Sequence, residues 1–151
     1  MPNVTRRILK GFDRQALIDA RAAATMTQGD LARIAGVSLT AIRDWEKGNN
    51  TPQVDKLAIV ARTLDVPLST LVVIAEIDRT LADLRILAGL TQPELGKAAG
   101  ISTTAVGALE RAEVGLSDMR AAALAETLAV DVATVRHAYS NAKNRPLGAP
   151  A

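Results

Sequence analysis

The chain has 151 residues, of which 48% are hydrophobic and only 2% aromatic, and its formal net charge is +2. A core of Leu, Ile, Val and Ala favours an all-α protein over a sandwich or barrel, which would use more β-branched and aromatic residues. The sequence has no cysteine and one histidine, His137. This composition argues against a disulfide scaffold, a zinc site and a catalytic site built on Cys or His. We therefore expect no cofactor and no enzymatic activity.

The charge is unevenly distributed along the chain. Residues 1–75 carry +3 (10 Lys or Arg against 7 Asp or Glu), residues 76–135 carry −4 (5 against 9), and residues 136–151 carry +3 (3 against none). No apolar run is long enough to span a membrane, and no apolar signal core follows the N-terminal charges. We therefore expect a cytoplasmic protein whose first half is better suited to meet a polyanion.

The second half of the sequence repeats the first. Residues 17–66 align with residues 81–130 without a gap, and 18 of the 50 pairs are identical. The abundance of Ala and Leu in both halves does not explain polar identities such as Thr27, Gln28 and Glu46. The chain therefore carries two copies of one domain.

Helical spacing and capping residues predict five short helices in the first copy. Thr27 and Ser38 are suited to cap helices, Gly36 to end one, and Thr91 with Glu94 has the pattern of a capping box in the second copy. The helices are expected over residues 13–24, from Gln28 to about Gly36, from Ser38 to about Lys47, over residues 54–64, and from about Leu68 onward.

The two copies are expected to share a helix. Between Leu68 and Ala88 there is no Gly or Pro, and apolar residues recur at positions 71, 74, 77, 81, 84 and 88. This spacing predicts one continuous helix about 30 Å long, with two helices kinked near Glu76 as the alternative. The expected organisation is a basic arm at 1–12, a first domain at 13–75, a second at 76–141 and a basic tail at 142–151, with both ends mobile.

The stretch from Thr27 to Gly48, TQGDLARIAGVSLTAIRDWEKG, resembles the helix-turn-helix of the phage-repressor family, which includes Cro, lambda-repressor and xenobiotic-response-element proteins. The resemblance covers residues 17–72 well and 81–137 more loosely. It implies an all-α fold of two tandem five-helix, lambda-repressor-like domains, with structural ion pairs between Arg21 and Glu46 and between Arg85 and Glu110. The residues that carry it are Gln28, Leu31, Ala32, Gly36, Val37, Ser38, Ile42, Trp45, Glu46, Gly48 and Pro52.

The same resemblance implies that residues 38–47 read the major groove of double-stranded DNA. The Arg43 guanidinium suits guanine, while Asp44 either accepts from cytosine or orients Arg43. Trp45 is expected in the core. The candidate DNA contacts of the first copy are Gln28, Ser38, Leu39, Thr40, Arg43, Asp44, Lys47, Asn49 and Asn50. Weaker candidates are Arg6, Arg7 and Lys10 in the arm, and Gln92, Ser102, Thr103, Thr104 and Arg111 in the second copy.

The second copy is degenerate at its reading helix. Gly107 and Ala108 stand where the first copy has Arg43 and Asp44, and Glu113 stands where a phosphate contact is expected. These replacements argue against base reading by this copy.

These features predict a sequence-specific DNA-binding transcriptional regulator, most simply a repressor of phage, plasmid or stress type, of bacterial or phage origin and associated with the nucleoid when bound. The alternative is an interaction module in which the second domain dimerises or binds a partner protein. A single chain reading an asymmetric two-part site also remains open. No membrane partner is expected.

Overall fold

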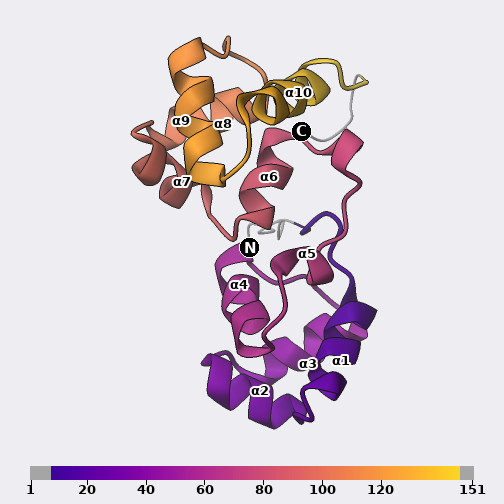
Figure 1. The fold of residues 1–151 in the computed structure, drawn as a ribbon. Coiled ribbons are helices and arrows are strands. Elements are labelled where there is room, and N and C mark those ends of the chain that lie inside the picture. The colour runs from indigo at the N-terminus through magenta and orange to yellow at the C-terminus, as the bar shows by residue number, and fades with distance from the viewer. Residues whose placement is uncertain (1–7, 147–151) are drawn as a thin grey trace, which may run out of the picture. The chain divides into compact units, whose positions relative to one another are not determined.

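The computed structural model describes residues 8–146 of the chain. Within these residues the chain forms ten α-helices and one short 3-10 helix, and its β-type pairing is limited to an isolated bridge between Phe12 and Val72 (Figure 1). The expected all-α fold is confirmed. Over the described part, no helix combines the length and the hydropathy needed to cross a bilayer. The chain divides after Val73 into two compact units, which we call the first and the second unit.

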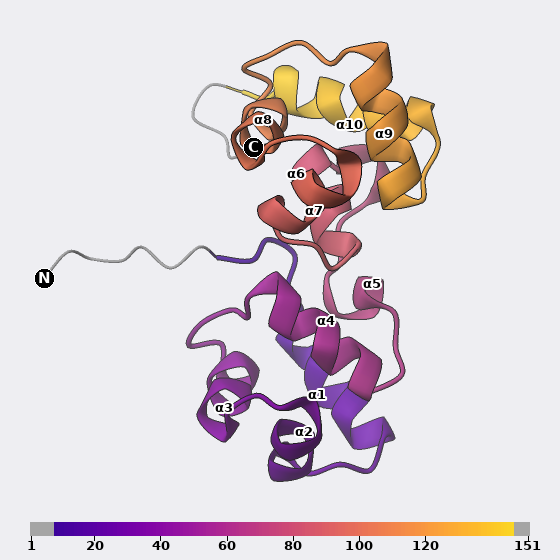
Figure 2. The same cartoon turned by 90° about the vertical axis from the view of Figure 1, so that its left-hand side faces the viewer.

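The first unit holds five helices, as the sequence predicted. They are α1 (Arg14–Ala23), α2 (Gln28–Ala35), α3 (Leu39–Lys47), α4 (Val54–Thr63) and α5 (Leu68–Leu71) (Figure 2). Asp13, Thr27 and Ser38 each accept a backbone N–H and cap α1, α2 and α3, which explains where these helices begin. The core side chains that are fully removed from solvent are Leu17, Leu31, Ile42, Leu57, Val60 and Leu71.

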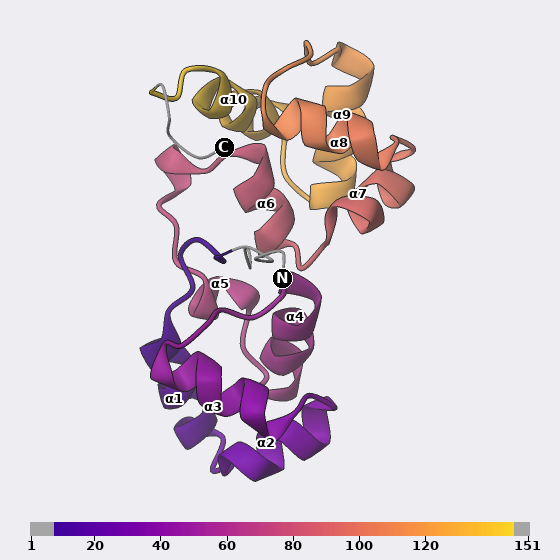
Figure 3. The ribbon, with the colours of Figure 1, turned by 180° about the vertical axis from the view of Figure 1, so that it is seen from behind.

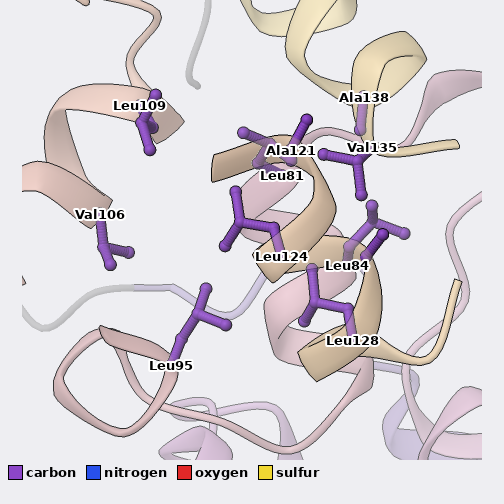
Figure 4. Packing of buried hydrophobic residues seen from close by; sticks show 11 residues of the cluster. Leu81, Leu84, Leu95, Val106, Leu109, Ala121, Leu124, Leu128, Val135 and Ala138 are labelled. Atoms are coloured by element: carbon purple, nitrogen blue, oxygen red, sulfur yellow. The ribbon is translucent and has the colours of Figure 1, made fainter. Parts of the chain in front are cut away.

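The second unit repeats this arrangement. After the 3-10 turn η1 (Glu76–Asp78) it has α6 (Leu81–Leu87), α7 (Gln92–Ala99), α8 (Thr103–Glu110), α9 (Asp118–Leu128) and α10 (Val132–Lys143) (Figure 3). The capping box of Thr91 and Glu94 is present, with Pro93 in the first turn. Every helix from α6 to α10 contributes to one apolar cluster, whose members include Leu81, Leu84, Leu95, Val106, Leu109, Leu124, Leu128 and Val135 (Figure 4).

The repeat is also visible in the backbone. At four pairs of equivalent positions the backbone adopts a left-handed φ in both units. At three of these pairs φ lies between 55° and 74°, and at the fourth it is 81° in the first unit and 55° in the second. The fourth pair is Gly48 and Ala112, so the second unit holds an alanine in a conformation that glycine adopts more easily. The other pairs are Thr25 and Gly89, Gly36 and Gly100, and Asp65 and Ala129.

The prediction of a shared helix between the copies is wrong. α5 ends at Leu71, and Val72 is extended at φ −126° and ψ 110°. The next α-helix starts only after Thr80, whose side chain forms a capping box with Asp83. The helix stops because residues 11–13 pair with this segment: the Val73 N–H donates to the Gly11 carbonyl at 2.9 Å. The alternative prediction, two helices kinked near Glu76, does not hold either, because residues 76–78 form a separate 3-10 turn.

The contacts of the two units reach further toward both ends of the chain than the sequence predicted. Leu9 is buried and its N–H donates to Thr51 Oγ1 at 2.8 Å, so the chain from residue 9 onward belongs to the first unit, while the Lys10 side chain is exposed. Arg6 and Arg7 lie outside the described residues. At the other end α10 continues to Lys143, because Ala142 extends the buried stripe of that helix.

Ala112 offers a test of the backbone repeat. An alanine in the left-handed conformation is strained by about 1–2 kcal/mol, and glycine would relieve this strain. Glycine also loses more conformational entropy on folding, which offsets part of the gain. Ala112→Gly is therefore expected to stabilise the second unit by about 0.5–1 kcal/mol. Denaturant unfolding followed through Tyr139, the single tyrosine of the chain, measures this change. As a control, Ala122→Gly in the middle of α9 should destabilise by about 1 kcal/mol. Equal destabilisation by both variants would contradict the assigned backbone.

Candidate nucleic-acid interface

A tight turn joins α2 to α3 in the first unit. Gly36 ends α2 at φ 72°, and the Val37 N–H donates a hydrogen bond to the Ala32 carbonyl at 3.1 Å. Ser38 then starts α3 by accepting the Ala41 N–H at 3.0 Å. Beneath the turn Ile42 is fully buried and Trp45 is 4% exposed, so Trp45 is a core residue as expected. The opposite face of α3 is therefore directed to solvent.

The exposed face of α3 carries two cations one helical turn apart. Arg43 and Lys47 are exposed, and neither makes an ion pair or a side-chain hydrogen bond with any residue between 8 and 146. Thr40 and Ser38 are exposed beside them, and Leu39 is half-buried. Because residues four apart lie on one helix face, both charges are available to the same anion.

Asp44 and the two asparagines form the end of this surface. Asn49 Nδ2 donates to Asp44 Oδ1 at 3.4 Å, and the Asn49 N–H donates to the Asp44 carbonyl at 3.0 Å. Asp44 thus engages the loop after α3. Asn50 is half-buried, and its Oδ1 is removed from solvent without a hydrogen-bond partner in the described residues.

A three-residue network ties α3 to the two helices before it. Glu46 on α3 accepts from Arg21 on α1 through Nε and Nη2, both at 2.8 Å, and from Gln28 Nε2 on α2 at 3.1 Å. The Glu46 side chain is only 5% exposed and that of Arg21 18%. A buried carboxylate with two cationic donors and one amide donor fixes the mutual orientation of the three helices.

The second unit contains the same network. Arg85 on α6 donates to Glu110 on α8 at 2.6 and 3.3 Å, and Gln92 Nε2 on α7 donates to Glu110 Oε1 at 2.8 Å. The remaining Nη1 of each arginine donates to a backbone carbonyl in the turn that follows its helix, Met26 or Leu90, at 3.0 Å. The duplicated residues therefore occupy duplicated positions.

The role of Gln28 was not foreseen from the sequence. We expected Gln28 and Gln92 as DNA contacts, whereas their amides are hydrogen-bonded to Glu46 and Glu110. The signal available in the sequence was that glutamine recurs in the second copy together with the arginine and the glutamate of the ion pair.

The electrostatics of the first network favour its charged form. Burial acts to raise the pKa of the Glu46 carboxyl, but the hydrogen bonds from Arg21 and Gln28 and the charge of Arg21 outweigh it, so the pKa lies below its usual value. The hydrogen bond to Glu46 in turn raises the pKa of Arg21, against a smaller opposing effect of burial.

The equivalent surface of the second unit differs in charge and shape. Thr103 and Thr104 are exposed on α8 and Ser102 caps it, but Gly107 and Ala108 offer no long side chain. The backbone at Gly96 on α7 lies so close to the following turn that it leaves no room for a side chain, since an added Cβ would lie 2.5 Å from the Ile101 carbonyl oxygen. Arg111, after α8, is paired with Glu113 at 2.9 Å.

Comparison with protein-family models gives two matches. The first is the helix-turn-helix family over residues 17–71, and the second is a helix-turn-helix domain family over residues 78–138. The chain belongs to the helix-turn-helix proteins. It carries two such domains in tandem, and the first is of the xenobiotic-response-element or lambda-repressor type. No curated protein matches the sequence. Because helix-turn-helix domains insert their second motif helix into the major groove, these matches support a DNA-binding regulator.

The Glu46 network makes the first unit sensitive to acid. Since the pKa of Glu46 is lowered in the folded state, the network's contribution is complete above the ordinary glutamate value of about 4.3 and is lost as the pH falls through the folded value. Glu46→Gln, which cannot ionise, should unfold with a weaker dependence on pH below about 4.3 than the wild type.

Trp45, the single tryptophan, reports the unfolding of the first unit at each pH, and Tyr139 reports the second unit as an internal control. Identical acid dependence in the wild type and Glu46→Gln would show that the network does not stabilise the ionised carboxylate.

Proposed function

We propose that the chain is a sequence-specific, double-stranded DNA-binding repressor whose α3 reads the major groove. The observation that carries this proposal is the exposed face of α3, with the cations Arg43 and Lys47, unpaired in the described residues, held outward by the Glu46 network. Bound DNA would supply the anionic partner that these side chains lack there. Repression would be steric, because a bound chain covers the promoter. The resemblance to the phage-repressor family further suggests that the regulated promoter is bacterial or phage.

Each residue of this surface has a distinct expected role. The Arg43 guanidinium matches the O6 and N7 atoms of guanine, and Leu39 and Thr40 suit apolar and hydroxyl contacts to base edges. Ser38 lies at the start of α3, where a backbone phosphate is expected, while the amide of Gln28 is engaged by Glu46. Lys47 in the last turn of α3 and Asn49 and Asn50 in the loop after it suit phosphate contacts, and Asp44 accepts a hydrogen bond from Asn49.

Arg43 and Lys47 provide the direct test, because one is expected to read a base and the other a phosphate. Arg43→Ala should cost about 1–3 kcal/mol of binding free energy and relax the preference at one base pair. Lys47→Ala should weaken all sequences alike and reduce the slope of log affinity against log salt by about one.

Selection of duplexes from a random pool by the wild type and both variants, at stated salt, measures both effects. The matched control is Arg62→Ala at the end of α4, which removes one exposed positive charge away from α3. An unchanged selected site with Arg43→Ala would show that α3 is not the reading helix.

For the second unit we propose a role in contacts with another copy of the chain. Its reading helix has Gly107 and Ala108 in place of long side chains, its arginine at 111 is neutralised by Glu113, and residues 76–135 carry a net charge of −4. A surface of this kind is poorly suited to a polyanion. Dimerisation through this unit would make the operator a palindrome of two half-sites, each read by one α3.

Stoichiometry distinguishes a dimer from a single chain that uses both units. Light scattering of the free protein and titration of the selected duplex should give two chains per palindromic site, with affinity unaffected by Thr103→Ala. One chain per asymmetric site, protected over two successive major grooves, would contradict the dimer and support tandem reading.

A further inference from the structure

In the second unit a guanidinium covers the position where the first unit has Arg43. Gly107 stands at that position of α8, and a Cβ added to it would lie 3.0 Å from Arg111 Nη1. Gly107 is accordingly buried, although Arg43 at the same point of the repeat is exposed. Arg111 reaches this place from one turn later, because side chains of a helix lean toward its N-terminus.

Glu113 holds Arg111 in this position. Its two carboxylate oxygens accept from Arg111 Nε at 2.9 Å and from Nη2 at 3.1 Å. Both side chains are about half exposed, at 49% and 56%, so the pair lies at the surface. Arg145 donates to the Arg111 carbonyl at 3.0 Å and adds a second positive charge near Glu113.

The chemistry of this pair resembles that of a phosphate contact. A carboxylate and a phosphate each offer two oxygens to the parallel N–H groups of arginine, so they compete for the same guanidinium. The first unit has no equivalent acid, because Asn49 stands at the repeat position of Glu113 and Lys47 is unpaired in the described residues.

We propose that Glu113 acts as an internal substitute for a DNA phosphate, which occupies Arg111 on the surface of α8 and keeps the second unit from binding the DNA backbone. The second unit has then retained the geometry of a phosphate-binding surface and is blocked by one carboxylate. This inference rests on the proposed DNA-binding function of the chain.

The test compares Glu113→Gln with a variant that removes the same charge elsewhere. Glu126→Gln on α9 is matched, because Glu126 is exposed and makes no side-chain hydrogen bond or ion pair within residues 8–146. The probe is a mixed-sequence duplex of about 40 base pairs, long enough for several major-groove faces. Affinity is measured over a series of salt concentrations, and thermal unfolding confirms that each variant is folded.

Glu113→Gln is expected to bind this duplex about threefold to tenfold more tightly than Glu126→Gln at low salt, with a salt slope steeper by about one. Arg111→Ala alone should change affinity little, because the arginine is already neutralised, and adding it to Glu113→Gln should remove the gain.

Equal affinities of Glu113→Gln and Glu126→Gln, or a gain that persists in the Arg111→Ala background, would overturn the inference. The loss of affinity in Arg43→Ala tests the proposed function separately: if Arg43→Ala weakens binding and Glu113→Gln has no specific effect, the inference alone fails. A wild-type chain that binds no duplex would overturn both.

Discussion

The orientation of the exposed helix in each unit depends on one buried carboxylate. In the first unit Glu46 accepts hydrogen bonds from α1 through Arg21 and from α2 through Gln28, and it lies on the inner face of α3. A buried carboxylate without partners would be costly, so this arrangement tolerates little rotation of α3. Because rotation of α3 would break these hydrogen bonds, Arg43 and Lys47 are kept on its outer face. The buried network therefore determines which side chains α3 exposes.

Comparison of the two units separates the features that maintain the fold from those that vary on its surface. The Arg–Glu–Gln network, the capping boxes at Thr27 and Thr91 and the left-handed positions recur in both units. The outer face does not recur. Gly107 replaces Arg43, and Arg111 is paired with Glu113 while Lys47 is unpaired in the described residues. The two surfaces therefore differ in charge available to DNA although they are built on the same scaffold.

Local features were predictable from the residues themselves, whereas the long-range ion pairs Arg21–Glu46 and Arg85–Glu110 were expected only from the family resemblance. Thr27, Ser38 and Gly36 mark helix ends through contacts with their near neighbours in the chain, so the limits of α2 and α3 follow from the sequence. The prediction of a helix across residues 72–80 failed because apolar spacing alone does not distinguish a helix from an extended segment such as this one, in which Val72 and Ile74 are buried but Val73 and Ile77 are exposed. What distinguishes the two is the pairing of Val73 with Gly11 at the other end of the first unit, which no local pattern reveals. The same limit applies to the interface: the sequence identified Gly107 and Glu113 as departures from the first copy, but not that Arg111 covers the glycine.

If α3, and not its counterpart α8, contacts DNA, the two helices must respond differently to a bound duplex. The most direct measurement is an NMR titration of the isotopically labelled chain with the duplex selected from the random pool, following backbone amide shifts. We expect changes concentrated between Ser38 and Asn49, with the amides of α8 little affected. Changes that are largest in α8, or that are spread over both units alike, would contradict this assignment.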